Sequence, residues 1–524
     1  MLPESIIRHP RVSLSPASEM KLPCYPTPPA CSSPNIPSDF DAKADLSVID
    51  PRKGRFSYAH SGVVLPRKLG QGMSLRDDLK FHSYGWNLGV RPEPHASIPP
   101  TVRRCLTFYD VSVYSQRYFE VVDPVYHFVD RTLFHDRCAK YWLAENGEPD
   151  DIEALVAGVV ALGSFFSAQP LSCEAQLVEH AKQILDIGSA YAPARLSLDQ
   201  AAAWVLRTLY LRLITRPHLS WYASCSAVHV VEAMGLHVDL KAVDLAADDS
   251  SALTADSIVS RRSIYECAAF LNAIISAEYG RSRIPLLGLT PAGDGDENAK
   301  SITPLMTLTR LLVLIETDPD PVKRWNALSS ICALPDEPPI FVLLRTDVAL
   351  HLYRTQVNAR HEKLSGLERQ AMISIIKMSL KAARHVLSSK QPWWNVISTP
   401  FQATMILMAM DSNETLDMIP ECMSVLTDIY LTFSTPPVLE VIRTAKRLIE
   451  CLKQRKLDQA EFLREAAEIS GIVENPSTES QGSLTTDHDS LIFDGLLGAD
   501  ANFNFMFEGD CWKNSSLQSL SDFS

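Results

Sequence analysis

Histidine, cysteine and acidic side chains are the groups that could bind a metal or catalyse a reaction in this 524-residue chain. The 14 histidines are never spaced i, i+4, so no single helix would present two of them to one metal ion. The 11 cysteines are scattered and form no Cys-x-x-Cys pair, which indicates free thiols in a reducing compartment. Acidic groups at 77–78, 248–249 and 294–297 could hold magnesium, but their polar or Gly-rich surroundings are typical of solvated loops.

Known catalytic motifs are missing from the sequence. It contains no Gly-x-Ser-x-Gly elbow, no phosphate-binding loop, no Gly-x-Gly-x-x-Gly and no His-Glu-x-x-His. We therefore expect a protein that is not an enzyme and that needs no cofactor or metal.

The C-terminal tail has a composition that suggests a different chemistry. Between Asp487 and Asp510 there are six acidic residues and no Lys or Arg. Mutually repelling carboxylates keep interspersed apolar side chains from collapsing into a core, which leaves them available to a partner's groove. This pattern is typical of a disordered transcriptional activation segment, although the same side chains could instead dock back onto the protein. The residues we expect to bind are Phe493, Leu496, Leu497, Phe503, Phe505 and Phe507.

The rest of the chain divides by composition into three parts. Residues 1–101 are proline-rich, with 15 of the 34 prolines in the first 100 positions, and should be mostly disordered. Residues 102–465 show helical periodicity without a strand ladder and should form one large all-α domain. Residues 466–524 should be a disordered linker followed by the acidic-aromatic tail. The expected helices span 152–166, 174–187, 199–215, 221–236, 259–279, 302–316, 339–357, 367–388, 400–411, 416–433 and 437–456.

The last predicted helix has an apolar seam with heptad spacing, formed by Val438, Ile442, Ala445, Ile449 and Leu452. The seam lasts about two heptads, whereas coiled coils usually need three or four. We therefore expect this helix to pack on the core of its own domain.

Charge and hydropathy bear on where the protein acts. The net charge is −13, and basic residues come only in small groups, such as those at 52–55, 67–68 and 103–104, which could serve nuclear import. The N-terminus has no secretory signal, and the longest apolar run, 154–166, is shorter than the roughly 20 residues that span a bilayer. We expect no membrane association.

The central helices resemble the middle homology region of fungal zinc-cluster transcription factors. The resemblance rests on a helix from Trp221 that ends in Gly235-Leu236-His237, then Arg261-Arg262, then Gly280-Arg281, in the family's order and spacing. It covers roughly 102–345 and is looser to about 455. Glu266, Asn272, Ser282 and Ser226 stand where the family commonly has Trp, Asp, Pro and Gly.

These family residues are expected to be architectural. Gly235 and Gly280 should end their helices in a left-handed conformation, and His237 should cap the exposed carbonyls. Arg261 and Arg262 should pair with carboxylates such as Asp239 or Glu232, although contact with a partner or a regulatory ligand is the alternative.

The family's zinc cluster needs six cysteines within about 30 residues to close two tetrahedral sites. The first 100 residues hold only Cys24 and Cys31, so we expect no zinc-cluster contact with DNA. The resemblance implies a nuclear regulator of metabolic or biosynthetic-cluster genes. It would act as an activator or co-activator through a DNA-bound factor or the co-activator machinery, with dimerisation possible. A gene model that lost an upstream exon and a cytoplasmic helical scaffold are the alternatives.

Overall fold

The computed structural model describes most of the central chain and a small N-terminal piece. The described residues are 47–50, 54–62, 64, 101–144, 152–190, 196–215, 217–240, 243–245, 255–285, 303–317, 320–357 and 363–469.

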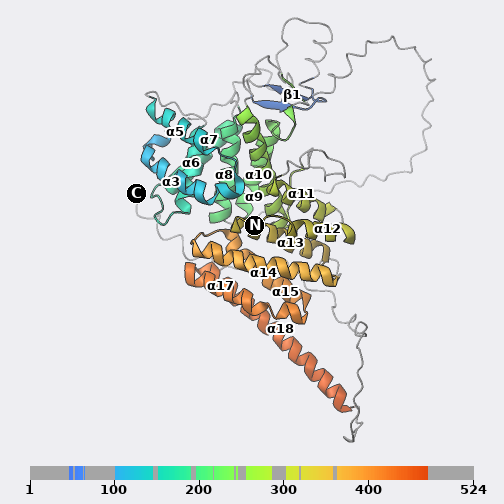
Figure 1. The fold of residues 1–524 in the computed structure, drawn as a ribbon. Helices are drawn as coiled ribbons and strands as arrows, with labels where there is room; N and C mark the ends of the chain where they lie inside the picture. The colour runs from blue at the N-terminus through green and yellow to red at the C-terminus, as the bar shows by residue number, and fades with distance from the viewer. Residues whose placement is uncertain are drawn as a thin grey trace, which may run out of the picture. The chain divides into compact units, whose positions relative to one another are not determined.

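The fold is all-α, as the sequence predicted (Figure 1). A 3₁₀ turn, η1 (Val102–Arg104), precedes the helices, and a π turn, η5 (Tyr353–Val357), extends α13. The helices up to β3 are α3 (Phe108–Val121), α4 (Asp123–Tyr126), α5 (Arg131–Leu143), α6 (Ile152–Phe165), α7 (Glu174–Ala190), α8 (Leu198–Ile214) and α9 (Pro217–Ala233). The later helices are α10 (Ala255–Tyr279), α11 (Pro304–Thr317), α12 (Pro321–Cys332), α13 (Pro339–Leu352), α14 (Gly366–Ser388), α15 (Trp394–Met410), α16 (Asn413–Leu416), α17 (Ile419–Phe433) and α18 (Pro436–Ile469).

Side chains at the helix starts explain several boundaries. Thr107 and Asp110 form a reciprocal capping box at α3, and Ser365 and Glu368 form another at α14. Each box satisfies backbone N–H groups that the first turn of a helix leaves unpaired. Ser197 caps α8 in the simpler way, by accepting a hydrogen bond from the backbone of Gln200.

One hydrophobic core runs through the helices from α3 to the first half of α18. The central helices are buried nearly all round: Leu162 of α6, Leu206 of α8, Phe270 of α10 and Leu343 of α13 are all inaccessible to solvent. Such helices show weak amphipathicity because almost every face meets another helix. In sequence order, α6 packs on α7 and α8, α8 on α9, α9 on α10, and α13 on α14.

A small three-stranded sheet was not predicted. Strand β1 (Ser47–Asp50) pairs antiparallel with β2 (Arg55–Ser57) and parallel with β3 (Val243–Leu245). Residues 47–50 and 54–62 are therefore structured, which corrects the prediction for that part of the proline-rich region. Ile49, Phe56 and Val243 of the sheet form an apolar cluster separate from the main core, and Tyr58, Val238 and Leu240 pack against it.

Some predicted helix boundaries were wrong. The predicted helices began at residue 152, so they missed α3, α4 and α5 as well as α12. They also began α15 at Pro400, whereas Pro400 lies inside α15. A proline interior to a helix removes a hydrogen bond and normally breaks the helix. Here Asn395 and Thr399, in the turns before it, donate to the carboxylate of Asp347 in α13, and these tertiary hydrogen bonds hold the first turns in place.

The first half of α18 packs as predicted on the core of its own domain. Val438, Ile442 and Ala445 are buried, and Ile449 packs partly against the same core. The helix continues to Ile469, well past the predicted end at 456. The chain divides into two units at Arg455 and Lys456, so the remainder of α18 belongs to the second unit.

Candidate functional site

The end of α9 is the centre of the family motif, and Gly235 gives the backbone the conformation that ends this helix. Gly235 has φ +64°, the left-handed conformation predicted for it. The N–H of Leu236 donates to the carbonyl of Val231 at 3.0 Å, and that of Gly235 to Glu232 at 2.9 Å. These two bonds define a Schellman helix end. A Cβ at Gly235 would also lie 2.8 Å from the Phe56 side chain, so glycine is required for its conformation and for space.

Arg261 caps this helix end, a role that the sequence analysis gave to His237. The Arg261 guanidinium donates to the carbonyls of Met234 and Gly235, at 3.3 and 3.1 Å. Burial lowers the pKa of Arg261 to about 10, so the group remains charged at neutral pH. The prediction that Arg261 pairs with a carboxylate was wrong, because the orphan carbonyls at the end of α9 are nearer acceptors.

His237 holds the small sheet instead of the helix end. Its Nε2 lies 3.0 Å from the hydroxyl of Tyr58, and its ring meets Phe56 edge to face with centroids 5.4 Å apart. Burial lowers the pKa of His237, which favours the neutral imidazole. The motif therefore joins α9, the start of α10 and the residues after β2.

The second motif glycine repeats this design at the end of α10. Gly280 has φ +59°, as predicted, and the N–H of Arg281 donates to the carbonyl of Ser276 at 2.9 Å. The Arg281 guanidinium lies 5.1 Å from the ring centre of Trp221 in α9. The Trp221 indole donates to the carbonyl of Ser282 at 3.2 Å, which ties the end of α10 to the start of α9.

The positions that depart from the family pattern are hydrogen-bonded. The Asn272 amide donates to the Ser224 hydroxyl at 3.0 Å and accepts from the N–H of Ile284 at 2.9 Å. Glu266 is buried and accepts from the Arg262 guanidinium at 2.8 Å and from the Thr303 hydroxyl at 2.6 Å. Arg262 thus pairs with a carboxylate one turn later on its own helix, whereas the prediction placed a partner on or just after the preceding helix.

A polar cluster that the sequence analysis missed lies where α8, α10, α13 and α15 meet. Buried Arg212 pairs with Glu278 at 2.5 Å, and its guanidinium lies 4.9 Å from the ring centre of Trp394. Burial, and then the charge of Glu278, raise the pKa of Asp347 to about 7. No spacing rule could have found these residues, because they come from four separate helices.

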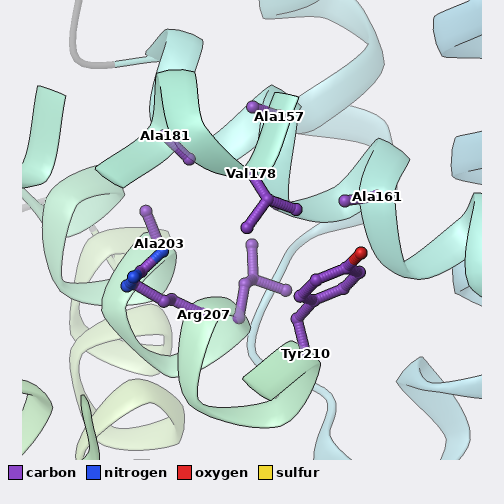
Figure 2. A pocket seen from close by; sticks show the side chains of 9 residues that line it. Ala157, Ala161, Val178, Ala181, Ala203, Arg207 and Tyr210 are labelled. Atoms are coloured by element: carbon purple, nitrogen blue, oxygen red, sulfur yellow. The ribbon is translucent and has the colours of Figure 1, made fainter. Parts of the chain in front are cut away.

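The pocket between α6, α7 and α8 is too small for a metabolite. Figure 2 shows its wall of small apolar side chains, including Ala157, Ala161 and Ala181, with Arg207 and Tyr210 at one side. Its volume is about 10 Å³, room for one water-sized sphere, whereas pockets for small molecules usually span hundreds of Å³. It is a packing imperfection and not a ligand site.

The described part of the chain contains no cluster of three or more His, Cys, Asp or Glu side chains arranged to hold a metal. Within the same residues, no helix combines the length and apolar character that a membrane span requires. The predicted activation residues Phe493, Leu496, Leu497, Phe503, Phe505 and Phe507 lie outside the described residues.

Comparison with known proteins places the motif residues within a known domain family. Residues 115–292 match the fungal specific transcription factor domain, and this range includes every motif residue from Gly235 to Arg281. The chain is also 31% identical to "Protein RDR1" of Saccharomyces cerevisiae, over 88% of this chain and 82% of that protein. The chain belongs to the fungal transcription factor family. It is therefore a fungal transcriptional regulator.

Other relatives of this fungal transcription factor point to the same class. It is 28% identical to "Transcription factor kojR" of Aspergillus oryzae, over 92% of this chain and 89% of that protein. It is 26% identical to "Probable transcriptional repressor C1348.12" of Schizosaccharomyces pombe, over 54% of this chain and 60% of that protein.

Proposed function

We propose that this transcription factor is a non-enzymatic nuclear activator that works through a DNA-bound partner. The carrying observation is the acidic-aromatic composition of residues 487–510, joined to a domain of the fungal transcription factor family. Membership of the family indicates that the protein acts in transcription. The tail favours activation over repression, because bulky apolar side chains among carboxylates suit a co-activator groove.

The helical domain, residues 102–465 in this proposal, supplies a rigid platform for the tail. Both family-motif helix ends have their carbonyls bonded, and the pocket between α6, α7 and α8 is too small for a ligand. A platform of this kind suits docking to proteins better than turnover of a substrate.

The proposal includes a DNA-bound partner; the cysteines of the printed sequence are scattered and form no six-cysteine run of the kind that builds a zinc cluster. We propose that a complete family member brings the protein to metabolic or biosynthetic genes. The Aspergillus oryzae relative is named as a transcription factor, which supports the part of this proposal that concerns transcription.

Nuclear import would depend on the basic groups before residue 70. Arg103, in the third group, donates to the carbonyls of Ala144 and Tyr141 and lies 4.2 Å from the Tyr141 ring centre. An arginine held in this way by the domain is poorly available to an import receptor. We therefore assign import to residues 52–55 and 67–68.

A tethered reporter tests the proposal. The full chain is fused to an unrelated DNA-binding domain, and reporter output is compared with that of a variant in which Phe493, Leu497, Phe503, Phe505 and Phe507 are alanine. We expect activation by the native chain and loss of most of it in the variant. Asn502→Ala with Asn504→Ala is the matched control, because these residues alternate with the aromatic ones and should leave activation unchanged.

The result also separates the alternatives. Equal activation by the native and alanine chains would refute the role of the tail. Reduced reporter output from the native chain would make it a repressor, as the name of the Schizosaccharomyces pombe relative suggests for that protein.

A further inference from the structure

Two cysteines from distant parts of the chain lie against each other at the edge of the main core. Cys105 follows η1 and Cys173 lies in the turn before α7, and both are partly exposed. The Cys173 thiol donates to the carbonyl oxygen of Cys105, with 3.2 Å between the sulfur and the oxygen. The two sulfurs are therefore at most roughly 8 Å apart, although the residues are 68 positions apart in the chain.

The other cysteines of the described residues are placed differently. Three of them are buried, two are exposed, and one is hydrogen-bonded to an asparagine; these are Cys138, Cys267 and Cys422, then Cys332 and Cys451, then Cys225. Buried thiols are inert, and a single exposed thiol has no neighbour with which to close a disulfide. The pair at the start of the domain combines access from solvent with a second thiol close by.

Hydrogen bonds hold the turn of Cys173 in place. The N–H of Leu171 donates to the Ser164 hydroxyl at 2.7 Å, and this hydroxyl donates to the Glu174 carboxylate at 2.5 Å. Each cysteine nevertheless lies outside the interior of a helix. Its backbone can therefore adjust, without loss of helical hydrogen bonds, to the Cα separation of about 4.4 to 6.8 Å that a disulfide requires.

We propose that Cys105 and Cys173 are a redox-sensitive modification site, at which the two thiols form a reversible intramolecular disulfide. The structure shows both as free thiols, which is the reduced state of the site. The bond closes a loop of the chain that contains α3, α4, α5 and α6. Such a crosslink stabilises a fold mainly by restricting the unfolded chain, and more so when the loop is long. The inference does not depend on activation by the tail.

The oxidant is a low-molecular-weight disulfide such as oxidised glutathione. Burial, and then the nearby charge of Cys105, raise the pKa of the Cys173 thiol, so we assign the first attack to Cys105. The Cys105 thiol releases its proton to water and attacks one glutathione sulfur; a mixed disulfide forms, and one glutathione thiolate leaves. Cys173 then releases its proton and attacks the Cys105 sulfur, which expels the second glutathione. Two protein thiols are oxidised, and one small disulfide is reduced to two thiols.

Equilibration of the dilute full chain in glutathione buffers, from fully reduced to strongly oxidised, tests the site. After an acid quench and alkylation of free thiols, mass spectrometry identifies the linked peptides. We expect a disulfide between Cys105 and Cys173 that disappears when excess reduced glutathione is restored. Cys105→Ser and Cys173→Ser should each abolish this crosslink and leave glutathione on the remaining cysteine, with the native circular dichroism spectrum retained.

Cys332→Ser is the matched control, because it removes an exposed thiol at the end of α12 and should leave the crosslinked fraction unchanged. The oxidised native chain should also have a higher Tm than the reduced chain, and Cys105→Ser should lack that shift. A native chain in which Cys105 and Cys173 stay reduced or carry glutathione separately would overturn the proposal. A crosslink that lowers Tm would overturn it as well, because the native fold would then not accommodate the bond.

Discussion

The junction of α9 with α10 buries its glycine and its arginine, whereas residues 456–468 of α18 leave their apolar and charged side chains in solvent. At the junction, each helix ends in a left-handed glycine, and a buried guanidinium satisfies the carbonyls of Met234 and Gly235. In residues 456–468, Phe462 and Leu463 lie in solvent and Arg464 forms only exposed pairs. The difference indicates that the family motif maintains the architecture, while residues 456–468 contribute no buried side chain to the core.

The comparison predicts that replacing the glycine at the junction lowers the free energy of unfolding more than any other change considered below. Gly235→Val should destabilise the protein by about 3 kcal/mol or more, because it adds left-handed strain to the clash with Phe56. Gly280→Ala, which meets open space, should cost only about 1 kcal/mol. Urea denaturation measures both.

Gly366→Ala is the control for that pair. Gly366 opens α14, has an ordinary backbone conformation, and its added Cβ would meet nothing within 4 Å. It should be neutral or slightly stabilising. Equal losses at Gly235 and Gly366 would contradict the structural role of the junction.

Arginine replacement should separate the two regions next. Arg261→Ala leaves the carbonyls of Met234 and Gly235 without their donor, and should cost about 2 kcal/mol in unfolding free energy. Arg464→Ala removes exposed pairs on a helix surface, and should cost about 0.5 kcal/mol or less. Similar losses for the two variants would show that burial does not distinguish these arginines.

The polar cluster at Asp347 predicts a pH dependence of smaller size. A folded-state pKa of about 7, above the usual 3.8, means that the folded protein binds a proton more readily than the unfolded chain. This carboxyl therefore favours folding as pH falls through 7, and lowers stability as pH rises. Between pH 8 and pH 6 its contribution should increase by about 1.4 kcal/mol.

Asp347→Asn should remove that slope, which urea denaturation at pH 6, 7 and 8 would show. Burial lowers the pKa of His351 from its usual 6.5 to about 4. The unfolded chain therefore binds this proton more readily, and His351 lowers the stability of the fold as pH falls below 6.5. His351 therefore gives a slope of the opposite sign at lower pH. If the Asp347→Asn variant showed the same pH dependence of its unfolding free energy as the native chain, another group would be responsible for the slope.

The sequence predicted those parts of the fold that local pattern determines. The apolar periodicity gave most helices, and Gly235 and Gly280 were predicted as left-handed helix ends, because glycine is the residue suited to that backbone. The packing of Val438, Ile442 and Ala445 on the domain's own core also followed from the short seam. These features depend on neighbours within one or two turns.

Features that depend on distant residues were not predictable. Phe56 contacts His237 and Gly235 across about 180 positions of the chain, so neither the sheet nor the role of His237 has a local signal. Arg261 caps the end of α9 because the fold brings the start of α10 beside the carbonyls of Met234 and Gly235. Asp347 in α13 accepts hydrogen bonds from Asn395 and Thr399 of another helix. The same tertiary bonds keep α15 helical through Pro400, against its local preference.

Hydrogen exchange of the full chain tests the contrast between the two regions most directly. Amides in α9 and α10 should exchange slowly, because they belong to the packed core. Amides of residues 456–468 should exchange faster, because every side chain of this segment is exposed to solvent. Equal protection of the two regions would contradict the account.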